Sequence, residues 1–137
     1  MEEIRITAGG AKDWIREIFA NVVEDMKADE LVISKYFDPE YVQHADGKRL
    51  DYDDFVAHMK CQKSVLQNVQ VTFAHILADG NKIATSHVVK GVKTSGEEIE
   101  AHVIAIFQSR SAKLVRCDEL TRLTKGAAAH GDLGSRT

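Results

Sequence analysis

Four extended segments follow one another between Asn68 and Leu123, with only short turns between them. Within each segment apolar residues recur at every second position, which is the period of a β-strand with one buried face. The three turns are rich in Gly, Asn, Asp and Ser, which tolerate tight backbone geometry. Turns this short join antiparallel neighbours, so the sequence predicts a four-stranded antiparallel meander.

The residues before the strands follow a helical period instead. From Trp14 to Met26 apolar residues recur at three- and four-residue steps, with Thr7 as a candidate N-cap and an expected end near Lys27–Glu30. Leu31–Phe37 is short and amphipathic, and it is also expected to be helical.

Two further helix starts are expected. Asp38-Pro39-Glu40 combines a capping residue, a proline suited to the first helical position and an acidic side chain. Asp51 precedes a second long helix, with Asp54 three residues later in a capping-box arrangement. The expected fold class is therefore α+β: a curved antiparallel sheet packed on N-terminal helices.

Length and composition limit the classes of protein. With 137 residues, we expect a single domain over residues 1–125 and a Gly- and Ala-rich tail over residues 126–137. The net charge of -3 argues against a nucleic-acid partner, and no apolar run approaches the ~20 residues of a membrane span. Two cysteines and a start without signal-peptide character predict a cytoplasmic protein.

The segment Ile99–Phe107 is apolar on both faces. Val103 and Phe107 lie on one face and Ile104 and Ile106 on the other. Only one face can meet the helices, so we expect a homodimer in which a partner subunit covers the other face. Shielding by long side chains such as Lys90 is the alternative within a monomer.

Asp118 is the first candidate catalytic residue. Strand alternation groups it with Leu114 and Leu120, and if this face is the inner one its carboxyl group is buried. Burial raises the pKa of a carboxyl group and suits it to general acid–base work. The alternatives are an ion pair with Arg116 or Arg122, or the reverse parity, in which Glu119 is the inner carboxylate.

Two histidines are candidate partners of that acid. His87 shares a strand face with Ile83, Thr85 and Val89, where it can exchange a proton with a ligand or serve as a neutral core residue. His44 lies at the mouth of a loop, where it can contact a ligand or bind the backbone near Asp46-Gly47. His102 is expected on the outer face.

The remaining candidates would line the gap between helices and sheet and bind a small hydrophobic ligand. No metal-ligand spacing, phosphate loop or nucleotide fingerprint is present, so neither a metal nor a cofactor is expected. The expected ligand-binding residues are Trp14, Phe19, Tyr41, Phe55, Met59, Phe73, His75, Val103, Phe107 and Leu120.

The order of these elements resembles the SnoaL-like branch of the nuclear transport factor 2-like superfamily. The resemblance covers residues 7–125 and is carried by Tyr36-Phe37-Asp38-Pro39-Glu40-Tyr41-Val42-Gln43-His44, Ala78-Asp79-Gly80-Asn81-Lys82-Ile83-Ala84 and Lys113-Leu114-Val115-Arg116-Cys117-Asp118-Glu119-Leu120. It implies a cone-shaped α+β fold with an apolar pocket between sheet and helices. It also implies a homodimer.

Members of this superfamily include polyketide cyclases, ketosteroid isomerases, epoxide hydrolases and non-catalytic proteins. The cyclases' late-strand aspartate would fall near Thr121 or Arg122, where this chain has no carboxylate. One hypothesis is cofactor-independent isomerisation or cyclisation of a small hydrophobic carbonyl compound by Asp118 with His87 or His44. The alternatives are a non-catalytic ligand-binding protein and a dimeric scaffold of the same fold.

Overall fold

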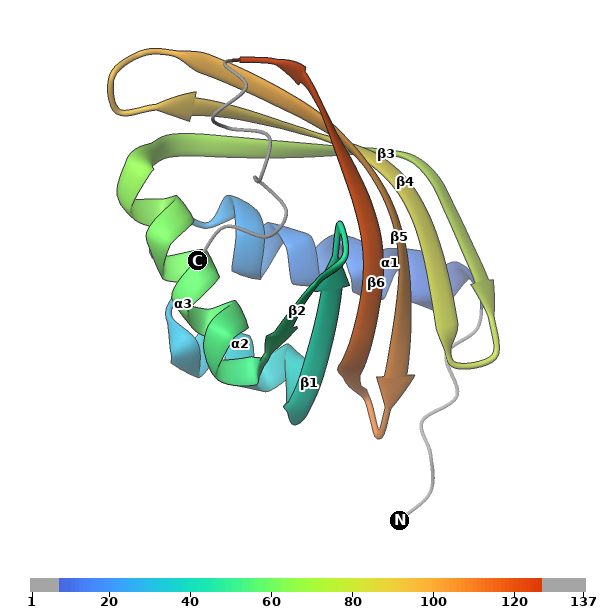
Figure 1. Ribbon diagram of the computed structural model, residues 1–137. Coiled ribbons are helices and arrows are strands. Elements are labelled where there is room, and N and C mark those ends of the chain that lie inside the picture. The colour runs from blue at the N-terminus through green and yellow to red at the C-terminus, as the bar shows by residue number, and fades with distance from the viewer. Residues whose placement is uncertain (1–7, 127–137) are drawn as a thin grey trace.

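The computed structural model describes residues 8–126 and comprises helices, a six-stranded sheet and short turns (Figure 1). The expectations for Thr7 and for the tail after Gly126 lie outside the described residues. In chain order the elements are α1 (Ala8–Ile18), the π-helix η1 (Phe19–Glu24), α2 (Glu30–Tyr36), β1 (Phe37–Ala45), β2 (Lys48–Asp51), α3 (Tyr52–Val65), β3 (Leu66–Asp79), β4 (Lys82–Lys93), β5 (Glu98–Arg110) and β6 (Lys113–Lys125).

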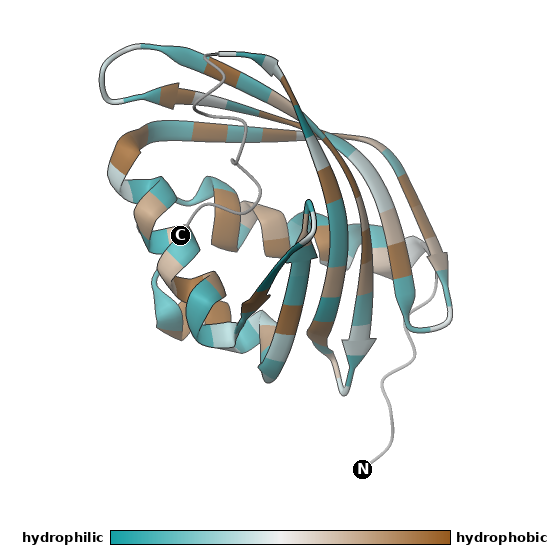
Figure 2. Ribbon diagram, viewed as in Figure 1, coloured by the Kyte–Doolittle hydropathy of each residue, from teal (hydrophilic) through white to brown (hydrophobic). Residues whose placement is uncertain are grey.

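The sheet has the order β2-β1-β6-β5-β4-β3, and it bends over the helices, which lie on its concave side (Figure 1). The four long strands β3 to β6 form the predicted antiparallel meander. The sheet as a whole is mixed, because β1 pairs in parallel with β6. Apolar and polar residues alternate along the long strands (Figure 2), which is the pattern of strands with one buried face.

The helix caps follow from local chemistry. The Asp29 side chain accepts from the backbone N–H groups of Leu31 and Val32 at the start of α2, which confirms a short helix here. At the start of α3, Asp51 and Asp54 form the predicted capping box, with N···O distances of 2.9 and 3.1 Å. Each cap binds backbone N–H groups that the helix itself leaves without a partner.

The first helix changes type instead of running unbroken to residues 27–30. Its α-helical part ends at Ile18 and the chain continues as the π-helix Phe19–Glu24. The Lys63 ammonium on α3 donates to the carbonyl oxygens of Val22 and Asp25, both at 2.8 Å, and the Glu24 carboxylate accepts from the N–H of Val71 on β3 at 2.8 Å. These contacts fix the π-helix against α3 and the sheet.

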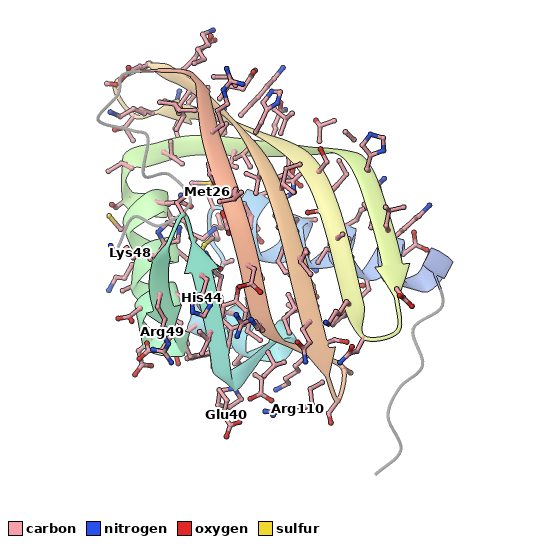
Figure 3. All side chains as sticks on the ribbon, turned by 45° about the vertical axis from the view of Figure 1, so that its right-hand side comes forward. Met26, Glu40, His44, Lys48, Arg49 and Arg110 are labelled. Carbon is pink, nitrogen blue, oxygen red and sulfur yellow. The ribbon has the colours of Figure 1, made fainter. Side chains whose placement is uncertain are left out.

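The predicted helix start at Asp38-Pro39-Glu40 is wrong, because these residues lie in strand β1. Asp38 accepts from the N–H of Glu40 at 2.8 Å, a local bond that also occurs outside helices. Pro39 falls where the β1–β6 register shifts, so its missing N–H costs no ladder bond. Arg110 donates to Asp38 and Glu40, and Figure 3 shows Glu40 and Arg110 at the same end of the sheet.

The core lies between the concave face of the sheet and the helices. Fully buried side chains come from α1 (Ile15), α2 (Ile33), β1 (Tyr41) and β6 (Leu114, Cys117), so every layer contributes to one apolar cluster. None of the helices in residues 8–126 is long and apolar enough to cross a membrane.

Candidate functional site

A cavity of about 100 Å³ lies inside the concave side of the sheet. Its wall is mainly apolar and aromatic, with a few polar side chains among the apolar ones. Such a combination is typical of small-molecule sites. The lining residues are Ile18, Phe19, Val23, Phe37, Tyr41, Gln43, Phe55, His58, Met59, Gln62, His87, Val89, Ala101, Val103, Phe107, Leu114, Glu119 and Thr121.

The carboxylate in this wall belongs to Glu119. The residue keeps a partial solvent contact, but protein surrounds its carboxyl group closely enough that burial raises its pKa to about 7. The hydroxyl of Thr121 donates to Oε2 at 2.9 Å and lowers the pKa, whereas the charge of Asp46 raises it further. Near neutral pH, Glu119 can therefore both accept and donate a proton.

A β-bulge decides which carboxylate faces inward. Ser109 of β5 pairs with Leu114, and its neighbour Gln108 pairs with Arg116, so Val115 is an extra residue in β6. One extra residue reverses the alternation, so that Leu114 faces the core but Asp118 does not. The expectation that Asp118 lies on the inner face is wrong, and the alternative with Glu119 inward is correct.

Asp118 belongs to the outer face of the sheet. Its carboxylate accepts two hydrogen bonds from the guanidinium of Arg116, at 2.9 and 3.0 Å, and this contact lowers its pKa. His44 is the parallel neighbour of Asp118 across β1 and β6, with Nδ1 at 3.6 Å from Oδ1 (Figure 3 labels His44 on β1). Neither side chain lines the cavity.

His87 does line the cavity. Its side chain is buried, and burial lowers its pKa from 6.5 to about 4, so the imidazole is neutral at pH 7. Its Nδ1 lies 2.9 Å from the hydroxyl oxygen of Thr85. The rings of Phe19 and Phe73 pack against it, with centroids at 5.0 and 5.2 Å. The hydrogen bond and the two rings fix the orientation of the imidazole.

Glu119 and His87 are separated by strand β5. His87 is opposite Val103, which is opposite Thr121, whereas Glu119 is opposite Ala105. Glu119 is therefore two strands away from His87 across the sheet, and it is offset along the strand direction by one inward-facing position. For strands ~4.8 Å apart and a rise of ~3.4 Å per residue, their Cα atoms are roughly 12 Å apart. A bound molecule can therefore lie between the acid and the imidazole.

A third polar group comes from β1. The hydroxyl of Tyr41 donates to Oε1 of Gln43 at 2.6 Å, and both side chains are buried on the inner face. Burial raises the pKa of Tyr41 well above its ordinary value, so it remains a neutral phenol. Gln43 is paired in register with Cys117, two residues before Glu119 on the same face. This places the amide and phenol beside the acid.

The structure sorts the predicted ligand-binding residues into three groups. Phe19, Tyr41, Phe55, Met59, Val103 and Phe107 line the cavity. Trp14 and Phe73 pack against the core without lining it. His75 and Leu120 are exposed, which contradicts the expectation for both.

The error at His75 has the same cause as the error at Asp118. Phe73 pairs with His87 and His75 with Ser86, so Ala74 is an extra residue in β3. The bulge keeps Phe73 on the inner face and turns His75 outward. Leu120 lies beyond the β6 bulge and is outward for the same reason.

Besides Glu119, which was expected only as the alternative to Asp118, four polar wall residues were not predicted as site residues: Gln43, His58, Gln62 and Thr121. Gln43 follows Tyr41 by two positions, so strand alternation in residues 37–45 was the signal that could have found it. The expected helix start at Asp38-Pro39-Glu40 hid that signal. Within residues 8–126, no three His, Cys, Asp or Glu side chains are arranged to hold a metal ion.

The fold, with an apolar cavity between the helices and a curved, unclosed sheet, defines a class of small α+β proteins. Comparison with known proteins gives the family. A model of the SnoaL-like domain matches residues 12–117. The chain therefore belongs to the SnoaL-like family.

One relative and two solved structures illustrate the similarity. The uncharacterized protein C11D3.04c of Schizosaccharomyces pombe is 31% identical over 125 residues, which are 91% of this chain and 95% of that protein. AclR from Streptomyces galilaeus, a proposed hydroxylase, has a TM-score of 0.73 at 17% identity, with 93% of this chain and 83% of that one covered. IdmH from Streptomyces antibioticus, a proposed polyketide cyclase, has a TM-score of 0.68 at 16% identity, with coverage of 80% and 90%. Both structures share the fold.

Proposed function

We propose that this protein catalyses cofactor-independent acid–base chemistry on a small hydrophobic carbonyl compound, with Glu119 as the proton carrier. The observation that supports this most directly is a carboxyl group with a pKa of about 7 in an apolar cavity, across from a neutral imidazole. A group whose pKa lies near the working pH is efficient both as acid and as base.

The proposed reaction moves one proton between two carbons. The Glu119 carboxylate removes a C–H proton next to the substrate carbonyl, and the electron pair of that bond moves to the carbonyl oxygen as an enolate. When Thr85 donates to Nδ1 of His87, the ring proton is on Nε2 and can bind the enolate oxygen. In a β,γ-unsaturated carbonyl compound the enolate is conjugated with the C=C bond, so Glu119 can return the proton to the γ-carbon while the double bond moves next to the carbonyl group, which completes an isomerisation.

The cavity volume limits the substrate. An engineered cavity of ~150 Å³ takes up benzene, so about 100 Å³ suits a molecule of roughly one ring. We therefore propose a monocyclic or similarly small carbonyl compound as the substrate.

The test is deuterium exchange of small cyclic ketones and enones in D₂O, followed by proton NMR. Wild-type protein should accelerate exchange at carbon next to the carbonyl, and Glu119→Gln should abolish the acceleration. Asp118→Asn is the matched control, because it changes the neighbouring carboxylate on the outer face, and it should retain the wild-type rate. An equal rate for wild type and Glu119→Gln would overturn the proposal.

A non-catalytic function is the second candidate. Ligand sites commonly enclose 300–1,000 Å³, and here aromatic side chains such as Phe37, Phe55 and Phe107 leave only about 100 Å³. This favours a ligand-binding or scaffold protein over an enzyme for large substrates. Thermal stabilisation by a small apolar compound that is equal in wild type and Glu119→Gln, without exchange, would support this alternative.

We also propose that the protein is a homodimer through the outer face of the sheet. Support comes from exposed Ile104, Ile106, Leu120 and Leu77, of which Ile104 and Leu120 are direct cross-strand neighbours. An apolar patch of this kind is typical of a protein–protein interface. The free thiols of Cys61 and Cys117 further support a reducing, cytoplasmic setting.

A further inference from the structure

Asp46, in the turn between β1 and β2, binds the backbone of β6 at two points. Its N–H donates to the carbonyl oxygen of Glu119 at 3.1 Å, and its Oδ1 accepts from the N–H of Thr121 at 2.8 Å. Asp46 has φ +53°, in the left-handed region that Asp and Asn adopt more readily than most residues. The chain adopts this conformation directly after the last β1–β6 pair, Ala45 with Glu119.

Thr121 connects Asp46 to the acid in the cavity wall. Its backbone N–H binds Asp46, and its hydroxyl donates to Oε2 of Glu119 at 2.9 Å. In a neutral carboxylic acid the carbonyl oxygen is the better acceptor, so a hydrogen bond to one oxygen favours the proton on the other oxygen. The arrangement therefore distinguishes the two oxygens of Glu119.

We propose that Asp46 is a positioning residue for Glu119: it holds Thr121 in place, Thr121 occupies Oε2, and the transferable proton is held on Oε1. This inference rests on the proposed function for the use of that proton. The negative charge of Asp46 adds a second effect, since a nearby anion disfavours ionisation of Glu119. Asp46 thus offsets part of the lowering by the Thr121 hydroxyl and keeps Glu119 neutral to a higher pH than it would be without this charge.

Tyr41, Cys117 and His87 are buried titratable groups of the inner sheet face that are neutral near pH 7, whereas the charged neighbour Asp118 lies on the outer face. Tyr41 and Cys117 have raised pKa values because both are buried, and His87 has a lowered pKa for the same reason. His58 reaches the same wall from α3. Among the described residues, Asp46 is the charged group whose effect on Glu119 is resolved.

The test separates charge from geometry by titrating the Glu119 carboxyl carbon with ¹³C NMR. Asp46→Asn removes the charge, tolerates the positive φ and keeps an oxygen that can accept from Thr121. The midpoint of Glu119, expected at about 7 in wild type, should fall by several tenths of a unit or more. Asp79→Asn changes an exposed aspartate at the end of β3, the opposite edge strand of the sheet, and should leave the midpoint unchanged.

Thr121→Val should shift the titration midpoint of Glu119 in the opposite direction. It removes the hydroxyl that stabilises the ionised form of Glu119, so the midpoint should rise, and Thr121→Ser should restore it. Simple loosening of the site would admit water and lower the midpoint in both variants. The inference is overturned if Asp46→Asn matches Asp79→Asn, if Thr121→Val lowers the midpoint, or if wild-type Glu119 titrates at an ordinary value.

No substrate enters these titrations, so their failure is distinguishable from failure of the proposed function. A wild-type-like rate of deuterium exchange in Glu119→Gln would contradict the proposed function but not the positioning role of Asp46. An unchanged Glu119 midpoint in Asp46→Asn, together with loss of deuterium exchange in Glu119→Gln, would contradict only the positioning role of Asp46.

Discussion

Asp118 and Glu119 are adjacent in the chain, yet their carboxyl groups point to opposite faces of β6 and have pKa values shifted in opposite directions. Asp118 accepts hydrogen bonds from Arg116 on the outer face, which lowers its pKa, whereas burial raises the pKa of Glu119 to about 7. The difference lies in strand parity, since alternate residues of a strand face opposite sides of the sheet. A single residue step therefore separates an exposed ion pair from a carboxyl group that lines the cavity.

Glu119 and His87 should affect stability with opposite pH dependence. The pKa of Glu119 is higher in the folded protein, about 7, than in the unfolded chain, so its ionisation destabilises the fold as pH rises from 4.5 to 7. Glu119→Gln should therefore gain stability relative to wild type over this range, by at most about 3.5 kcal/mol at ~1.4 kcal/mol per pKa unit. Urea denaturation at pH 5.0, 6.0 and 7.0 measures this difference.

His87 shows the reverse sign. Its pKa is about 4 in the folded protein and 6.5 in the unfolded chain, so the fold loses stability as pH falls from 6.5 to 4. His87→Asn, which retains a polar group near Thr85, should gain stability relative to wild type toward low pH. In wild type the two effects oppose each other between pH 4.5 and 6.5. If the stability of both variants relative to wild type changed with pH in the same direction, the protonation states assigned to Glu119 and His87 would be contradicted.

Strand alternation predicts which side chains face the inner side of the sheet only as far as the first β-bulge of each strand. The meander, its turns and the cap of α3 follow from local rules that involve neighbouring residues. The parity of His75 and Asp118 depends on the extra residues Ala74 and Val115, and a bulge is a property of two paired strands. His87 lies in β4, where the register with β5 is unbroken, and its inward orientation agrees with simple alternation.

Strand β1 shows a different limit. Asp38-Pro39-Glu40 satisfies the local rules for a helix start. However, Phe37 before it and Val42–Ala45 after it pair with β2 and β6, and β6 begins more than 60 residues later in the chain. Tertiary pairing overrides local propensity here. As a result, Gln43 was not predicted as a site residue, because its inward orientation is evident only when residues 37–45 form a strand.

The outer face should control the oligomeric state. Ile104 is 58% exposed and has Leu120 beside it on β6. A lysine at this position would place a charge in the proposed interface, so Ile104→Lys should convert a dimer into a monomer in light scattering after size-exclusion chromatography. Leu31→Lys is the matched control, because Leu31 is 75% exposed on α2, away from the sheet face, and it should remain dimeric. A monomeric wild type would contradict the proposed dimer.

The two cysteines should differ sharply in reactivity. Cys117 is fully buried and burial raises its pKa well above the ordinary value, whereas Cys61 is partly exposed on α3. The thiolate is the reactive form, so iodoacetamide should label Cys61 under native conditions and leave Cys117 unmodified. Mass spectrometry of peptides distinguishes the two sites, and denatured protein should show both labelled. Equal native labelling would indicate that the β1–β6 pair opens.

The cavity can be filled from Ala101, a buried residue of β5 that lines it. Ala101→Val adds two methyl groups, which occupy empty space and should stabilise the protein by about 1 kcal/mol while reducing any response to small apolar compounds. Ala105→Val makes the same change four residues along the same face, at a buried position that does not line the cavity. There the added volume meets packed atoms, and a loss of ~1–3 kcal/mol is expected. Thermal and urea unfolding of both variants, with and without a small cyclic ketone, would show whether the cavity is open space for a ligand. Equal destabilisation by Ala101→Val and Ala105→Val would show that it is not.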